Sequence, residues 1–147
     1  MMARQKPRLP RGIRNNNPGN IRLSSQRWLG QKTFQFDPDF IEFETSLMGL
    51  RALMKLLLNY YSKFGLNTVE SIINRYAPPH ENATDGYIGS VCKAMAVKRR
   101  DALDLNKDAT LILLVKAFCQ HENGMPKNGQ WYADTLFAKA ATAARAK

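Results

Sequence analysis

Two His-Glu-Asn tripeptides carry the glutamates best placed for chemistry in this chain, Glu81 in YAPPHENATDGY and Glu122 in LILLVKAFCQHENGMP. A glutamic acid that stays protonated near neutral pH can act as the general acid that cleaves a glycosidic bond. Glu122 ends an apolar stripe with helical spacing, formed by Leu111, Val115 and Phe118. Burial and the negative end of a helix dipole both disfavour a carboxylate anion, so the sequence favours Glu122 as the acid.

The other acidic residues have simpler structural interpretations. Glu81 follows two prolines and precedes a predicted helix, where a carboxylate meets the positive end of the helix dipole. Most glycosidases use a second carboxylate besides the general acid. The candidates for it in this chain are Asp37, Glu42 and Glu44. Asp37 could equally be a turn residue, and Glu44 could stabilise the start of the next helix. Without a second carboxylate, Glu122 would act first as acid and then as base.

Other enzyme classes find no support in the sequence. Two histidines and two cysteines form no metal-binding pattern, and there is neither a G-x-S-x-G elbow nor a glycine-rich phosphate loop. We therefore expect no metal and no cofactor. The longest apolar runs, residues 56–58 and 111–115, are far shorter than a membrane span of about 20 residues. No apolar core follows the charged N-terminus, so we expect synthesis in the cytoplasm without a signal peptide.

The chain is strongly basic, with a net charge of +10 over 147 residues and a pI near 9.9. Such a charge favours an anionic partner, and DNA, RNA, acidic lipid and the bacterial cell wall all qualify. Nucleic acid is not favoured, because no helix clusters the Arg and Asn side chains that read bases. Lys and Arg residues together with two prolines predict a flexible basic arm over residues 1–11, and residues 12–147 are predicted to form a single domain.

Hydrophobic periodicity predicts a mainly α fold. The clearest helix is SLMGLRALMKLLLNYYSKF, capped by Thr45 or Ser46 and stopped by Gly65. Further helices are expected from Asn67 to about Tyr76, from Asn82 or Thr84 to about Met95, from Asn106 or Asp108 to Gly124, and from about Ala133 to Ala144. Glu70 is expected to complete a capping box with Asn67. The alternating stretch KTFQF predicts a small β-hairpin between Ile21 and Phe36.

The string GIRNNNPGNIR, which begins at Gly12, resembles a motif of small phage virion-associated proteins and cell-wall lysins. Those sequences continue with Trp-x-Gly, then a Gly-x-Arg-Ala helix, then an Arg-aromatic-Ala-Pro-Pro-x-Glu-Asn segment, then His-Glu-Asn-Gly. The matching strings in this chain are RWLG, GLRAL, RYAPPHENATDGY and HENG. The resemblance therefore covers nearly the whole chain after residue 11.

A more distant similarity is to bacterial autolysin-type glucosaminidases, which have a lysozyme-like fold. In those enzymes a catalytic helix ending in Glu-Ser-Gly precedes an Asn-Asn-x-x-Gly-Ile stretch, a Trp-x-Gly hairpin and a Tyr-Ala-Thr-Asp helix start. This chain has NNNPGNI, RWLG and YAPPHENATDGYI in that order, but its helix ending HENG comes last, with Asn123 in place of the serine. The simplest account is a circularly permuted, lysozyme-like α+β domain.

The resemblance implies cleavage of the β-1,4 glycan backbone of peptidoglycan, by a muramidase, a glucosaminidase or a lytic transglycosylase. It makes Glu122 the catalytic acid. Amides that bind sugar hydroxyls and aromatic rings that stack on pyranoses would line the same cleft, and these residues are Asn15, Asn16, Asn17, Asn20, Trp28 and Tyr76. The implied partners are peptidoglycan and other virion proteins, with action at the wall or within the phage particle. The alternatives are a turn for the asparagine run and a non-catalytic virion protein on a degenerate lysozyme-like fold.

Overall fold

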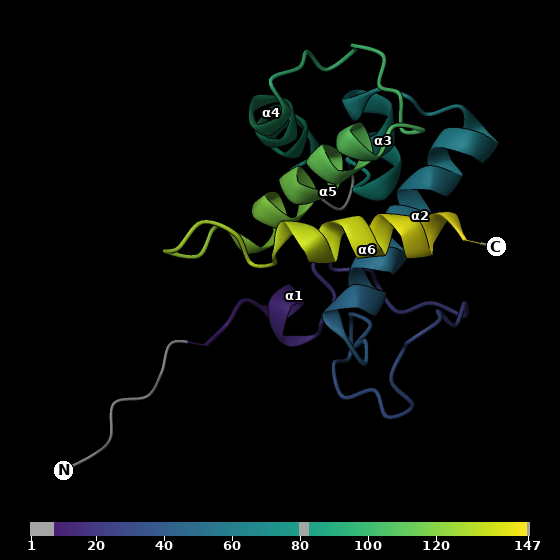
Figure 1. The fold of residues 1–147 in the computed structure, drawn as a ribbon, viewed down its shortest axis with the longest axis vertical. Coiled ribbons are helices and arrows are strands. Elements are labelled where there is room, and N and C mark those ends of the chain that lie inside the picture. The colour runs from purple at the N-terminus through teal and green to yellow at the C-terminus, as the bar shows by residue number, and fades with distance from the viewer. Residues whose placement is uncertain (1–7, 80–82, 147) are drawn as a thin grey trace.

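The computed structural model describes residues 8–79 and 83–146 as a mainly helical domain (Figure 1). Glu81 lies outside the described residues. The helices are α1 (Arg11–Arg14), α2 (Ser46–Phe64), α3 (Val69–Tyr76), α4 (Thr84–Met95), α5 (Asp108–Asn123) and α6 (Asp134–Arg145). The mainly α class predicted from the sequence is confirmed. None of these helices is long and apolar enough to cross a lipid bilayer.

Helix α2 forms where the sequence predicts it, because both of its ends are capped. The Thr45 side chain accepts a hydrogen bond from the Met48 N–H, and Gly65 ends the helix in the left-handed conformation, with φ of 66°. Leucines on one face, among them Leu50, Leu53 and Leu57, are fully buried. This face packs in the core, and α2 packs along α6.

Helix α5 lies at the centre of the domain, where it contacts α1, α2, α4 and α6 (Figure 1). Its apolar stripe is buried as predicted, and Gly124 follows its last residue. One prediction about the neighbouring α3 is wrong. Its capping box is formed by Thr68 and Ser71, not by Asn67 and Glu70. The Glu70 carboxylate instead pairs with arginines of the loop that follows α4, Arg99 and Arg100.

The region of the predicted hairpin, Ile21 to Phe36, is a loop in the structure. Within the described residues it forms no strand, only two isolated antiparallel bridges that join Arg22 to Phe40 and Gln31 to Phe43. The reason lies in Gln35, the fourth residue of KTFQF. Its side chain donates to the carbonyls of Asp37 and Phe40 and accepts from the Glu42 N–H, so backbone groups that could pair in a hairpin are bound to a side chain instead.

The asparagine-rich segment, residues 15–20, is wedged between α2 and the C-terminal end of α5. A Cβ added to Gly49 of α2 would lie 1.7 Å from the Asn16 carbonyl oxygen. One added to Gly12 of α1 would lie 2.5 Å from the Asn123 amide oxygen at the end of α5. Both positions therefore require glycine. Helix α1, which the sequence did not reveal, thus joins the start of the described chain to the end of α5.

Candidate functional site

Glu122 lies in the last turn of α5 and is partly buried. Its Oε1 accepts a hydrogen bond of 2.9 Å from the Asn20 side-chain amide, although 102 positions separate the two residues in sequence. Asn20 has a φ of 51°, in the left-handed region that asparagine tolerates better than most residues. Among the described residues, none forms an ion pair with Glu122. The carboxyl group is therefore oriented by the Asn20 amide, and the Tyr87 hydroxyl interacts with it.

Glu122 and Asn20 open onto a surface pocket of about 250 Å³. The pocket is formed by the asparagine-rich segment and the residues after it, by α2, by α3 and by the end of α5. Its lining residues are Asn20, Ile21, Arg22, Phe40, Leu56, Tyr60, Tyr76, Ala77 and Glu122. Among the described residues of this lining, Glu122 is the one acidic side chain and Arg22 the one basic side chain. The pocket thus holds one carboxyl group among aromatic rings and an amide.

Two further bonds fix the asparagine-rich segment against Glu122. The buried amide of Asn123 donates to the Pro18 carbonyl at 2.8 Å and to the Cys119 carbonyl at 3.0 Å. The Tyr76 hydroxyl donates to the Gly19 carbonyl. Sequence reasoning did not name Asn123 as a site residue, although its place in the HENG string beside Glu122 was a usable signal. Both bonds keep Asn20 in reach of the carboxyl group.

Two tyrosines lie beside the Glu122 carboxylate. Burial raises the pKa of the Tyr76 and Tyr87 hydroxyls well above the usual value, and the charge of Glu122 raises both further. Both phenols therefore stay protonated at neutral pH and can donate hydrogen bonds. The Tyr87 hydroxyl is buried beside the Glu122 carboxylate. Its ring stacks on His121 at a centroid distance of 3.8 Å.

The other predicted sugar-binding residues do not line this pocket. Amides of Asn15, Asn16 and Asn17 bind within the protein, donating respectively to the Asp37 carboxylate, to the Phe43 carbonyl and to the carbonyls of Ile21 and Ile41. These three amides therefore hold the segment in place within the protein. Trp28 is buried in the core. The structure thus brings Asn20 and Tyr76 together with Glu122, and leaves the other four apart from it.

The predicted second carboxylates also lie outside the pocket. Asp37 accepts two hydrogen bonds from Arg11, at 2.6 and 2.7 Å. The bond from Arg11 lowers the pKa of Asp37 well below its usual value, against the opposing effect of burial, and bonds from the Phe40 N–H and from Asn15 lower it further. Glu44 is exposed just before α2. In the described chain no group of His, Cys, Asp and Glu residues could hold a metal ion.

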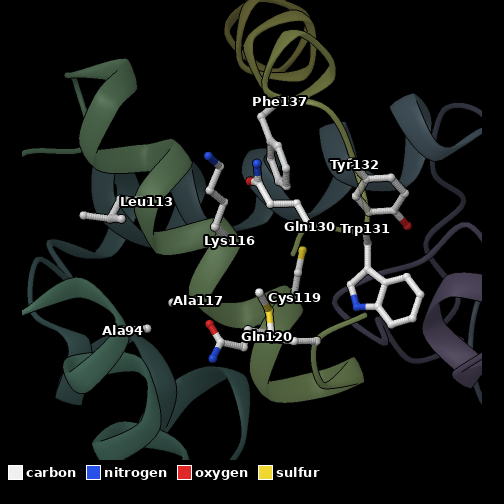
Figure 2. A pocket seen from close by; sticks show the side chains of 11 residues that line it. Ala94, Leu113, Lys116, Ala117, Cys119, Gln120, Gln130, Trp131, Tyr132 and Phe137 are labelled. Carbon is white, nitrogen blue, oxygen red and sulfur yellow. The ribbon is translucent and has the colours of Figure 1, made fainter. Parts of the chain in front are cut away.

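A second pocket, of about 200 Å³, lies along α5, between α4 and the segment that leads into α6 (Figure 2). It is mainly apolar, with Leu113, Met125 and Trp131 among its lining residues. Burial raises the pKa of the Cys119 thiol to about 12, so this sulfur is not a nucleophile at neutral pH. The Trp131 indole donates to the Gly124 carbonyl at 2.8 Å. This pocket lacks converging reactive groups, and we do not assign chemistry to it.

Comparison with known proteins places the chain among phage proteins. No protein-family model matches it. It is 39% identical over 117 residues to Protein P5 of Pseudoalteromonas phage PM2, an alignment that covers 78% of this chain and 71% of that relative. The aligned part thus includes most of both proteins. At this identity and coverage, the chain belongs to the family of the phage protein P5.

Proposed function

We propose that this protein cleaves the β-1,4 glycan backbone of bacterial peptidoglycan, with Glu122 as both acid and base, in the manner of a lytic transglycosylase. The observation that carries the proposal is the Glu122 carboxyl group, hydrogen-bonded by Asn20 and facing an open pocket. Membership of a phage protein family supports a bacterial target. A net charge of +10 supports an anionic one.

The geometry at Glu122 suits proton transfer from one oxygen. Because Oε1 accepts a hydrogen bond from Asn20, the proton of the neutral acid belongs on Oε2. In the proposed reaction this proton passes to the glycosidic oxygen as the bond from that oxygen to the anomeric carbon breaks. The carboxylate left behind then takes the proton of the sugar's own hydroxymethyl group, whose oxygen bonds to the anomeric carbon. The product is an anhydro sugar, and no water is consumed.

The transglycosylase form is favoured because, among the residues that the structure describes, the pocket lining holds one carboxylate. A hydrolase of the usual two-carboxylate type needs a second, about 5 to 9.5 Å from the first. Asp37 is bound to Arg11, and Glu42 accepts from the Phe36 N–H at 2.6 Å. Tyr76 and Tyr87 keep their protons, so Glu122 is the lining group suited to exchange one.

The lysozyme-like, circularly permuted arrangement is part of the same proposal. The bond between Asn123 and the Pro18 carbonyl supports it, because it seats the asparagine-rich segment on the end of the glutamate-bearing helix. In the autolysin-type order, the chain itself connects the catalytic helix to the asparagine-rich stretch. In a permuted domain this connection is absent, so noncovalent contacts must hold the two segments together. The rival, a non-catalytic virion protein, would be favoured by a Glu122 sealed in the core or paired with arginine. The partly exposed, unpaired Glu122 supports the enzyme instead.

The test is Glu122→Gln, assayed by clearance of purified cell walls and by the mass of the released sugars. We expect the wild type to release products lighter by one water than hydrolysis gives. The variant should lose on the order of a hundredfold to ten-thousandfold in rate, as removal of a general acid does. Its melting temperature should stay near wild type, since the glutamine oxygen can still accept from Asn20.

Glu44→Gln is the matched control, because Glu44 is exposed and does not line the pocket. It makes the same chemical change and should retain activity. Full activity in the Glu122 variant, or loss in the Glu44 variant alone, would refute the assignment. A large fall in melting temperature for Glu122→Gln would give this residue a structural role, and products that contain the added water would establish hydrolysis.

A further inference from the structure

Arg22 is a cation in the wall of the Glu122 pocket that pairs with no carboxylate of the described residues. It follows Asn20 by two residues, is exposed to solvent and lines the pocket with Glu122. Seven ion pairs join described residues, and none includes Arg22. Its guanidinium lies 5.2 Å from the centroid of the Phe40 ring, which also lines the pocket. The charge of Arg22 therefore faces the space a substrate would occupy.

Arg11 offers a local comparison, because it approaches the same aromatic ring. The Arg11 guanidinium lies over the same Phe40 ring, 4.6 Å from its centroid. However, Arg11 pairs with Asp37 at 2.6 Å and with Asp39 at 3.0 Å. Two guanidiniums thus approach the Phe40 ring. Arg11, outside the pocket, is paired with carboxylates, and Arg22, in the pocket wall, is paired with none of the described ones.

The backbone holds Arg22 in a defined position. Arg22 forms an antiparallel bridge with Phe40, and the preceding carbonyl, of Ile21, accepts hydrogen bonds from the Ile41 N–H at 3.0 Å and from the Asn17 amide at 3.0 Å. The guanidinium is therefore presented from a fixed segment. A planar guanidinium pairs best with a carboxylate or a phosphate, to which it can donate two parallel hydrogen bonds.

We propose that Arg22 binds a carboxylate carried by the glycan, so that the pocket selects acidic peptidoglycan over neutral polymers of N-acetylglucosamine. This inference rests on the proposed function and adds a substrate class to it. The carboxylate comes either from the stem peptide or, where that peptide has been removed, from the lactyl group of muramic acid. Arg22 attracts this group, so the acidic sugar takes the Arg22 end of the pocket.

The experiment measures binding in the Glu122→Gln background, so that cleavage of the glycan does not alter the measured affinity. The probes are whole peptidoglycan, glycan strands stripped of peptides by an amidase, the same strands with carboxyls converted to amides, and neutral chitin oligosaccharides. Arg22→Gln should bind the stripped strands about tenfold to a hundredfold more weakly, the loss expected for one charge-assisted hydrogen-bonded pair. Arg22→Lys should recover part of this binding.

Conversion of the carboxyls to amides should weaken binding to the protein that keeps Arg22. The loss should equal the loss that Arg22→Gln causes with the unconverted stripped strands. Lys139→Gln removes one positive charge from an exposed position on α6 and should change nothing. Dependence on Arg22 for stripped strands assigns the lactyl carboxylate, and dependence for whole peptidoglycan alone assigns the stem peptide. Equal weakening on acidic and neutral glycans, or none on either, overturns the inference.

The two proposals fail separately. Wild-type protein that binds acidic glycan through Arg22 but never cleaves it refutes the proposed function and leaves the inference intact. Wild-type protein that clears walls, with an unchanged preference for acidic over neutral glycan in Arg22→Gln, refutes the inference and leaves the function intact. Melting curves of each variant confirm that the compared proteins are folded.

Discussion

The hydrogen bond between Asn20 and Glu122 defines the orientation of the carboxyl group. We expect Asn20→Gly to lower the rate of wall cleavage by about tenfold to a hundredfold, because a freely rotating acid is seldom aligned with the bond it cleaves. Glycine is the informative replacement, since the left-handed φ of 51° costs it nothing. The measurement is wall clearance combined with thermal melting, which should change little.

Asn16→Gly provides the comparison for Asn20→Gly. Asn16 is the same residue type with a nearly equal φ of 52°, but its side chain bonds the Phe43 carbonyl and the Ser46 hydroxyl, away from the pocket. It should lower the melting temperature and leave the rate per folded molecule unchanged. The opposite pattern in the two variants would mean that Asn20 supports the fold and that Asn16 contacts the substrate.

Individual site residues were only partly predictable from the sequence. The apolar stripe that ends at Glu122 is a local pattern, so the sequence placed this residue correctly on its helix. Which asparagine of residues 15–20 faces Glu122 depends on contacts with α5 about a hundred positions away, and no local pattern encodes them. Arg22 and Tyr87 were missed for the same reason, since their importance comes from what lies beside them.

At the scale of elements, helices with capping residues and periodic apolar faces were predictable. The start of α2 and the glycine stops of α2 and α5 are short-range signals, and they matched the structure. The absence of the hairpin was not predictable. The alternating sequence KTFQF is compatible both with a strand and with the observed loop, which the Gln35 side chain stabilises. Its exposed Phe34 and Phe36 would each suit a strand, but no partner strand pairs with them in the described chain.

The ion pair between Arg11 and Asp37 fastens α1 to the loop before α2, and it predicts a pH dependence of stability. The folded-state pKa of Asp37 is lowered, so its contribution is complete above the unfolded-state value of about 3.9. As the pH falls below that value towards the folded-state pKa, the contribution is lost. Melting temperatures should therefore fall between about pH 4 and pH 2.

Asp37→Asn isolates this effect from that of the other carboxylates. The variant should be less stable than wild type at pH 7, and the two melting curves should converge as the pH falls. Arg11 was assigned by sequence to the basic arm, but it begins α1 and forms this pair. Parallel curves over the whole pH range would show that the bond contributes nothing to folding.

At the scale of the whole molecule, the net charge of +10 predicts that binding to an anionic partner depends on salt. We expect its binding to purified cell walls to weaken steadily between about 0.1 M and 1 M salt, because the screening length falls from about 10 Å to about 3 Å over that range. Binding of the Glu122→Gln variant, measured by sedimentation with walls, avoids any effect of cleavage. Neutral chitin oligosaccharides should show a smaller salt dependence. Wall binding that is unchanged at 1 M would remove the support that net charge gives to an anionic target.

The contact between the asparagine-rich segment and the end of α5 also determines when the pocket can form during synthesis of the chain. Asn20 emerges from the ribosome early, but its partner Glu122 follows 102 residues later, together with the amide of Asn123 that holds Pro18. Nascent domains fold as their segments become available. A chain interrupted before Glu122 therefore contains the basic start of the protein without an acid. Unfinished copies therefore lack the pocket, and only molecules completed through α5 can form it.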